Sequence, residues 1–170
     1  LSVTDQALGL DHEGMKKCFS VLGGEQSGFK EGQKVRGLLG RGAKDTAVFG
    51  TTIFETIQNN VYNRFELNRD GNYKLEDAST ATKAIHRELG IEYGKNGLRA
   101  KIIFDQPSDI SDYTKLRERI SKTVQLREIT AHREVLLKRL DGIKSSTERV
   151  VWNPPTMEQL KEIEFELEEF

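Results

Sequence analysis

The sequence of 170 residues contains one cysteine, three prolines and one tryptophan. A single cysteine, Cys18, excludes an internal disulfide framework and is typical of a reducing compartment, so we expect a cytoplasmic protein. No apolar run approaches the roughly 18 residues that a membrane span needs, and no signal peptide is visible, so we expect no membrane association. With 26 basic and 27 acidic side chains, the chain has no overall electrostatic attraction to nucleic acid.

Hydrophobic periodicity predicts both strands and helices. Alternating or β-branched stretches predict strands, two of which form a hairpin around Asn59-Asn60. Residues 162–170 fit a strand or a helix equally well. The expected strands are 1–5, 51–57, 61–67 and 98–105, with a second hairpin of 133–140 and 147–152, and the expected helices are 11–22, 42–50, 79–89 and about 109–129.

This order of elements predicts an α+β fold class, a two-layer sandwich of helices on a mixed, mainly antiparallel sheet, followed by the start of a second α/β element. We expect a first domain over residues 1–107 and a connecting helix with a β-hairpin over 108–170. The chain has no initial methionine and opens inside a predicted strand, so we expect it to be a fragment.

The stretch VTDQALGL places a carboxylate at the end of a predicted strand. Asp5 is followed by Ala7 and Gly9 in a tight turn, which leaves room beside the carboxylate. Such a carboxylate can accept a hydrogen bond from an exocyclic amine, and the small residues let a flat ring approach the backbone. An aspartate before a turn also serves commonly as a local cap, and this reading stays open.

Glycines are dense in the stretch GLLGRGAKD, immediately before a predicted helix. Gly37, Gly40 and Gly42 allow the backbone to adopt positive φ angles and to expose its N–H groups. Lys44 adds a cation. These features predict a phosphate cradle, although a flexible joint is an equally plain explanation. The preceding segment 23–41 is polar and glycine-rich, which predicts a mobile lid.

The two stretches together, DQALG and then GLLGRGAKD after a helix and a glycine-rich segment, resemble the GHKL superfamily of gyrase, heat-shock-chaperone, histidine-kinase and mismatch-repair ATPases. The resemblance covers roughly residues 1–105 and implies a Bergerat-type ATP-binding fold whose lid closes on ATP. Asn96-Gly97 is similar to a third motif of the family, but Leu98 stands where a threonine is usual. The residues implied to bind the nucleotide are Asp5, Ala7, Gly9, Gly37, Gly40, Arg41, Gly42 and Lys44.

The resemblance implies ATP, ADP and Mg²⁺ as ligands, and a transducer-like region after residue 107 that contacts a further domain or a protein partner. In that family the catalytic glutamate and the metal-binding asparagine precede the first motif, so both are expected upstream of residue 1. The full-length protein is therefore expected to hydrolyse ATP and these 170 residues are not. A homodimer stays open.

Three alternatives remain. The chain can be a non-catalytic interaction module in which the glycine-rich segment is only flexible. ELNRDGNYKLED places oxygen ligands at EF-hand spacing, although its flanks predict strands and a hairpin turn explains the same residues. KLRERISKTVQLRE is a candidate nucleic-acid contact, but its mixed charges are typical of a solvated helix face. The EF-hand positions are Glu66, Asn68, Asp70, Gly71, Asn72 and Asp77.

Overall fold

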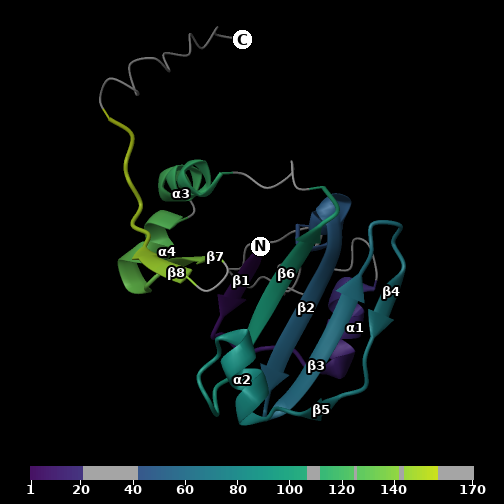
Figure 1. The fold of residues 1–170 in the computed structure, drawn as a ribbon. Coiled ribbons are helices and arrows are strands. Elements are labelled where there is room, and N and C mark those ends of the chain that lie inside the picture. The colour runs from purple at the N-terminus through teal and green to yellow at the C-terminus, as the bar shows by residue number, and fades with distance from the viewer. Residues whose placement is uncertain (21–41, 107–111, 125, 142–143, 157–170) are drawn as a thin grey trace, which may run out of the picture. The chain divides into compact units, whose positions relative to one another are not determined.

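The computed structural model describes residues 1–20, 42–106, 112–124, 126–141 and 144–156. The chain divides into two compact units, Leu1–Ile110 and Ser111–Phe170. The first unit contains a six-stranded sheet and the second a two-stranded sheet (Figure 1). The predicted α+β class is confirmed. Among the described residues, no helix has the length and apolar character needed to cross a membrane.

The sheet of the first unit has the strand order β1-β6-β2-β3-β4, and β5 also pairs with β3. Every pairing between its described strands is antiparallel, so the expectation of a mixed sheet is wrong. The reason is that β6 runs between β1 and β2 in the opposite direction to both. The strands are β1 (Ser2–Asp5), β2 (Gly50–Gln58), β3 (Val61–Leu67), β4 (Tyr73–Leu75), β5 (Ser79–Thr80) and β6 (Gly97–Phe104).

The hairpin between β2 and β3 agrees with its prediction. Asn59 and Asn60 have φ angles of 51° and 64°, the left-handed pair that a two-residue type I′ turn requires. Gln58 therefore lies opposite Val61. Because side chains alternate along a strand, this register puts Phe54 and Phe65 on one face of the sheet.

Helices lie on both faces of this sheet. On one face, α1 (His12–Phe19) and the 3₁₀ helix η2 (Lys44–Phe49) pack on Phe54 and Phe65, where Phe19 stacks on Phe54 with ring centroids 3.9 Å apart. On the other face, α2 (Lys83–Leu89) covers Ile57. Figure 1 shows α1 behind the sheet and α2 in front of it. This arrangement differs from the single helical layer that a two-layer sandwich implies.

The three described helices of the first unit are all shorter than predicted. α1 ends at Phe19, with Ser20 as its C-cap, where the sequence predicts a helix over 11–22. The expected helix 79–89 begins at Lys83, because Ser79 and Thr80 pair with β3 and the Thr82 hydroxyl accepts the N–H of Ile85 as the N-cap. The expected helix 42–50 is a six-residue 3₁₀ helix that ends at Phe49, because the φ of the next residue, Gly50, is 147° and is not helical.

The second unit contains two helices where the sequence predicts one over about 109–129. They are α3 (Tyr113–Lys122) and α4 (Leu126–His132). Asp112 caps α3 by accepting the N–H groups of Thr114 and Lys115, which sets a later start. The helix ends because Thr123 has an extended backbone, and two consecutive β-branched residues, Thr123 and Val124, disfavour its continuation.

The hairpin of the second unit consists of β7 (Leu136–Asp141) and β8 (Lys144–Arg149). The expected second strand, 147–152, is therefore displaced toward the turn. The reason is the turn length: with Asp141 opposite Lys144, the register places Arg149 opposite Leu136, where β7 begins.

Candidate functional site

The predicted carboxylate lies at the end of β1. Asp5 is exposed, and its Oδ1 accepts the N–H of Ala7 at 3.0 Å. This hydrogen bond is the local capping role that the sequence analysis left open for Asp5. No described residue donates a hydrogen bond to the second oxygen, Oδ2. The turn therefore orients the carboxylate and leaves one oxygen able to accept a hydrogen bond from a ligand.

Gly9 allows two parts of the backbone to approach closely. Its φ is +69°, and a Cβ at this position would lie 2.2 Å from the carbonyl oxygen of Ile57. The next residue, Leu10, donates its N–H to the Thr56 hydroxyl at 2.7 Å. The turn after Asp5 is therefore held against the end of β2, and a glycine is required there by the protein itself.

At the end of β1, four residues of neighbouring strands lie opposite one another across the sheet. Asp5 is opposite Leu98, Leu98 is opposite Thr56, and Thr56 is opposite Asn63. Thr56 is fully buried and donates its hydroxyl to the Gly97 carbonyl at 3.1 Å, while a Cβ on Gly97 would lie 2.4 Å from the Asp5 carbonyl oxygen. The first and third predicted motifs are therefore neighbours.

Thr56 is a residue that the sequence analysis missed. Its stretch, TTIFETI, signals only a strand, and the hydroxyl gains its role from partners 46 and 41 residues away in the chain. Asn63 was also missed, because its stretch, VYNRFEL, signals only a strand. It is fully buried, and neither its Oδ1 nor its Nδ2 has a partner among the described residues.

An apolar surface borders Asp5 on the same face. Val3 is 66% exposed, and Leu98 and Ala100 are partly buried. Because Val3 and Asp5 alternate with residues of the opposite face, all four side chains belong to the face that α1 covers in part. A carboxylate oxygen beside apolar side chains suits a planar ring that carries an amino group.

Much of the predicted phosphate cradle lies outside the described residues: Gly37, Gly40, Arg41 and the expected lid over 23–41. Gly42 is described and exposed, no heavy atom lies within 4 Å of a Cβ placed there, and its φ is outside the left-handed region. Neither backbone conformation nor packing therefore requires glycine at position 42.

Lys44 occupies the first position of η2 and is 5% exposed. It lies close enough to Cys18 to lower the pKa of that thiol, although burial has the larger effect and raises the pKa above its ordinary value. Cys18 packs at the edge of the core, as its helical spacing predicts. Lys44 stands beside α1 instead of projecting into solvent.

The candidate calcium loop is a β-hairpin. Residues 66–67 belong to β3 and 73–75 to β4, so strands flank the turn where an EF-hand has helices. Asp70 accepts both the backbone N–H and the side-chain amide of Asn72, which lowers the pKa of its carboxyl. Nowhere in the described ranges do three or more His, Cys, Asp or Glu side chains form a group that could hold a metal ion.

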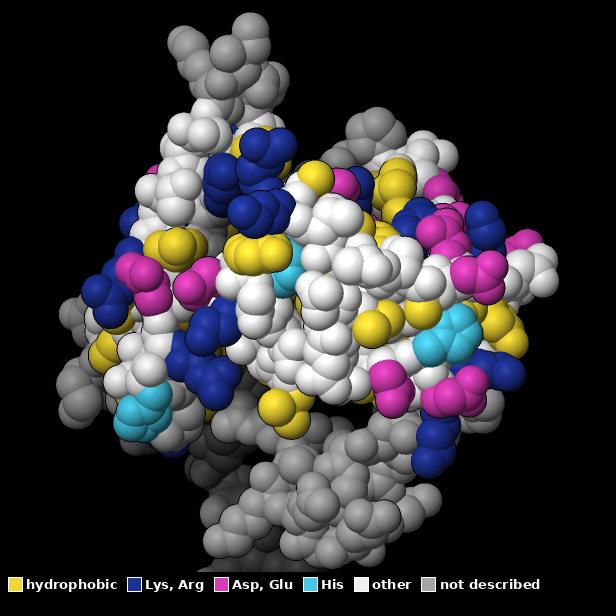
Figure 2. Space-filling view, turned by 90° about the horizontal axis from the view of Figure 1, so that it is seen from below, with side chains coloured by type: hydrophobic (Ala, Val, Ile, Leu, Met, Phe, Trp, Pro, Cys, Tyr) yellow, Lys and Arg dark blue, Asp and Glu magenta, His cyan; other side chains and the backbone are white. Residues whose placement is uncertain are grey.

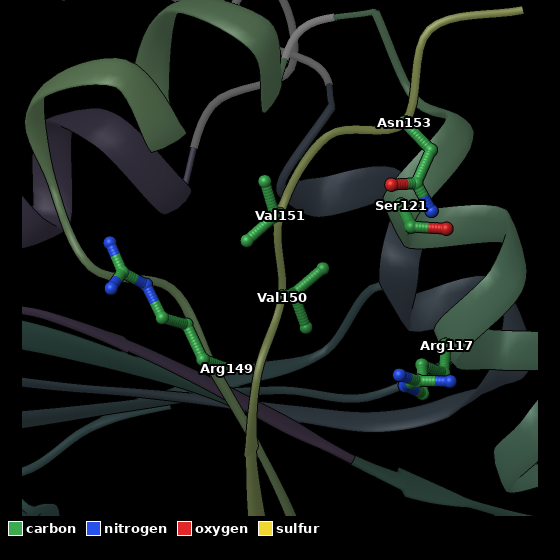
Figure 3. Close-up of a pocket in the computed structure, with 6 residues that line it drawn as sticks. All are labelled: Arg117, Ser121, Arg149, Val150, Val151 and Asn153. Atoms are coloured by element: carbon green, nitrogen blue, oxygen red, sulfur yellow. The ribbon is translucent and has the colours of Figure 1, made fainter.

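The second unit has a small cavity of about 200 Å³, lined in part by Arg117 and Arg149. Figure 3 shows these guanidinium groups on opposite sides of the segment that carries Val150 and Val151, so they do not converge on one point. Arg117 also pairs with the Glu148 carboxylate at 2.7 Å. Figure 2 shows acidic and basic side chains near one another toward the left and right of the visible face, with mostly uncharged atoms between them. These features give no support to the nucleic-acid alternative.

We find no protein-family model that matches the chain and no curated protein that matches it. The resemblance to the GHKL superfamily therefore depends on the motifs at residues 5–9 and 37–45, and it stays a prediction.

Proposed function

We propose that residues 1–107 are an ATP-binding domain of the GHKL type and that the adenine ring binds at the end of β1. The observation that carries this proposal is the accepting oxygen of Asp5 beside the apolar surface of Val3, Leu98 and Ala100. Adenine combines a flat apolar ring with an amino group. When the ring leaves water, the hydrogen bonds of that amino group to water must be replaced by hydrogen bonds to the protein. An aspartate fixed by its own turn supplies the acceptor in one orientation.

The remaining residues have separable roles in this proposal. Ala7 keeps the turn free of a large side chain beside the ring, and Gly9 lets that turn lie against the end of β2. The phosphates extend toward Gly42, where open space lets them approach the backbone. Lys44 contributes positive charge from its buried position. Mg²⁺, when bound, would neutralise phosphate charge, and the described residues do not by themselves form a site for it.

Replacing Asp5 with asparagine is expected to weaken ATP binding by about 1.5–3 kcal/mol, the range for a hydrogen bond to a charged group. The asparagine amide directs a donor at the adenine amino group in place of an acceptor. Calorimetric titration of the chain with ATP and GTP measures the effect, since guanine carries an acceptor oxygen where adenine has its amino group. The wild type should therefore prefer ATP, and Asp5→Asn should lose that preference.

Asp70→Asn is the matched control for this variant. Asp70 is also exposed and accepts the N–H of the residue two positions later, but it lies in the turn between β3 and β4. ATP affinity should stay at the wild-type value in Asp70→Asn. If Asp5→Asn binds ATP as the wild type does, Asp5 is not part of the site, and a wild type without measurable ATP affinity contradicts the proposed function itself.

Gly42→Val tests the phosphate end. Because no heavy atom lies near this position, the substitution should leave the melting temperature close to that of the wild type. A valine side chain would keep phosphates away from the backbone, so ATP affinity should fall about tenfold or more, which is 1.4 kcal/mol or more. Adenosine, which has no phosphate, should bind as before. Equal losses for ATP and adenosine would favour a flexible joint instead of a phosphate cradle.

A further inference from the structure

A buried ion pair lies on the face of the sheet opposite the candidate site. Glu55 of β2 is 5% exposed, and one of its oxygens accepts hydrogen bonds from Arg99 of β6, from Nε at 2.8 Å and from Nη2 at 2.6 Å. The Tyr62 hydroxyl donates to the other oxygen at 2.9 Å. Burial and this hydrogen bond raise the pKa of Tyr62, so its hydroxyl stays a donor. The guanidinium of Arg99 is therefore fixed in one orientation.

Arg99 also holds the end of α2. Its Nη1 donates to the carbonyl of Glu88 at 2.8 Å, and Nη2 lies 3.2 Å from the Glu88 carboxylate. The next residue of α2, Leu89, accepts the hydroxyl of Thr4 at 3.2 Å. Thr4 lies directly opposite Arg99 in the sheet. The end of α2 is thus connected to β6 through Arg99 and to β1 through Thr4.

Asp5 depends on this arrangement because β1 is an edge strand. Among the described strands, β6 is the only neighbour of β1 in the sheet. Leu98, which precedes Arg99, is opposite Asp5, and a Cβ added to Gly97 would clash with the Asp5 carbonyl oxygen. A shift of β6 at Arg99 would therefore be transmitted directly to the end of β1.

We propose that Arg99 is a positioning residue for the adenine end of the candidate site, which it reaches through β6 from the opposite face. This inference depends on the proposed function, because the orientation of Asp5 matters only if a ligand forms a hydrogen bond with it. A site that distinguishes an amino group from a carbonyl oxygen needs its acceptor held within a fraction of an ångström. Arg99 supplies that restraint without touching the ligand.

The test compares Arg99→Met with Arg64→Met. Arg64 lies on the same face, is also largely buried, and pairs with Glu66 and Glu76 at 2.7 Å each, but no described contact joins it to β1 or α2. For Arg99→Met we expect ATP affinity to fall about tenfold while GTP affinity changes less than about twofold. For Arg64→Met the two affinities should keep their wild-type ratio.

A double-mutant cycle separates positioning from general destabilisation. In the Asp5→Asn background, Arg99→Met should change ATP affinity by less than about twofold, because residues that act through one contact are not additive. A tenfold loss in that background would overturn the proposal. So would equal losses for ATP and GTP, or the same loss of ATP preference in Arg64→Met.

Amide hydrogen exchange on the nucleotide-free protein tests the positioning role of Arg99 without requiring ATP binding. The N–H groups of Ala7 and Leu10 donate to Asp5 and Thr56, so their exchange rates report whether the site's own hydrogen bonds persist. We expect both rates to rise about fivefold or more in Arg99→Met and to stay unchanged in Arg64→Met. Unchanged rates in Arg99→Met overturn the role of Arg99, whereas a wild type that does not bind ATP overturns only the proposed function.

Discussion

Replacing Glu55 with alanine is expected to lower the free energy of unfolding by about 3–5 kcal/mol, the usual cost of removing one partner of a buried ion pair. The substitution leaves the Arg99 guanidinium, 12% exposed, without its main partner and the Tyr62 hydroxyl without an acceptor. Chemical denaturation in urea, followed by circular dichroism, measures the loss.

Glu66→Ala is the control for Glu55→Ala. Glu66 lies on the same face and also pairs with an arginine, Arg64 at 2.7 Å, but its side chain is 28% exposed. Water can replace the lost partner there, so the expected loss is about 0.2–1 kcal/mol. Similar losses for the two variants would mean that burial does not set the strength of the Glu55 pair.

Replacing Gly9 with alanine is expected to cost about 2–5 kcal/mol of stability. The left-handed backbone at φ +69° accounts for about 1–2 kcal/mol, because a Cβ clashes with the following peptide. A further 1–3 kcal/mol, about the cost of overpacking, comes from the Ile57 carbonyl oxygen, 2.2 Å from the new Cβ. Relief of this contact must move the turn away from β2, so the hydrogen bond from Leu10 to Thr56 should also weaken.

Gly71→Ala isolates the contribution of the close contact. Gly71 has a comparable φ of +85°, but no heavy atom lies within 4 Å of its Cβ position. Its replacement should cost only the left-handed term of about 1–2 kcal/mol. ATP affinity, measured where both variants are fully folded, should fall in Gly9→Ala and not in Gly71→Ala. Equal stability losses would contradict the structural role assigned to Gly9.

Features with local causes were predictable from the sequence. Asn59-Asn60 predicted the β2–β3 hairpin, because these residues tolerate the left-handed pair that a two-residue turn needs. Alternation placed Asp5 at the end of a strand, and helical spacing placed Met15 and Phe19 on the buried face of α1. The α+β class followed from these elements. Each inference needed only residues within one turn or one strand.

Helix boundaries were less predictable because neighbouring elements compete for the same residues. Thr80 is as good a helix-capping residue as Thr82, and only pairing with Val61 assigns it to a strand. Thr123 is compatible with the periodicity of a long helix, yet its extended backbone ends α3. The absence of parallel pairs among the described strands depends on where β6 inserts, which strand propensity does not encode.

The contacts between polar groups could not be predicted in this way. Thr56 contacts Leu10 and Gly97, and Arg99 contacts Glu55 across 44 residues, through pairings that no local pattern specifies. The burial of Lys44 beside Cys18 likewise depends on η2 packing near α1. The physical reason is that hydrogen bonds and desolvation depend on distance in space. Strand register brings these distant residues together, so the environment around Asp5 could be read only from the folded chain.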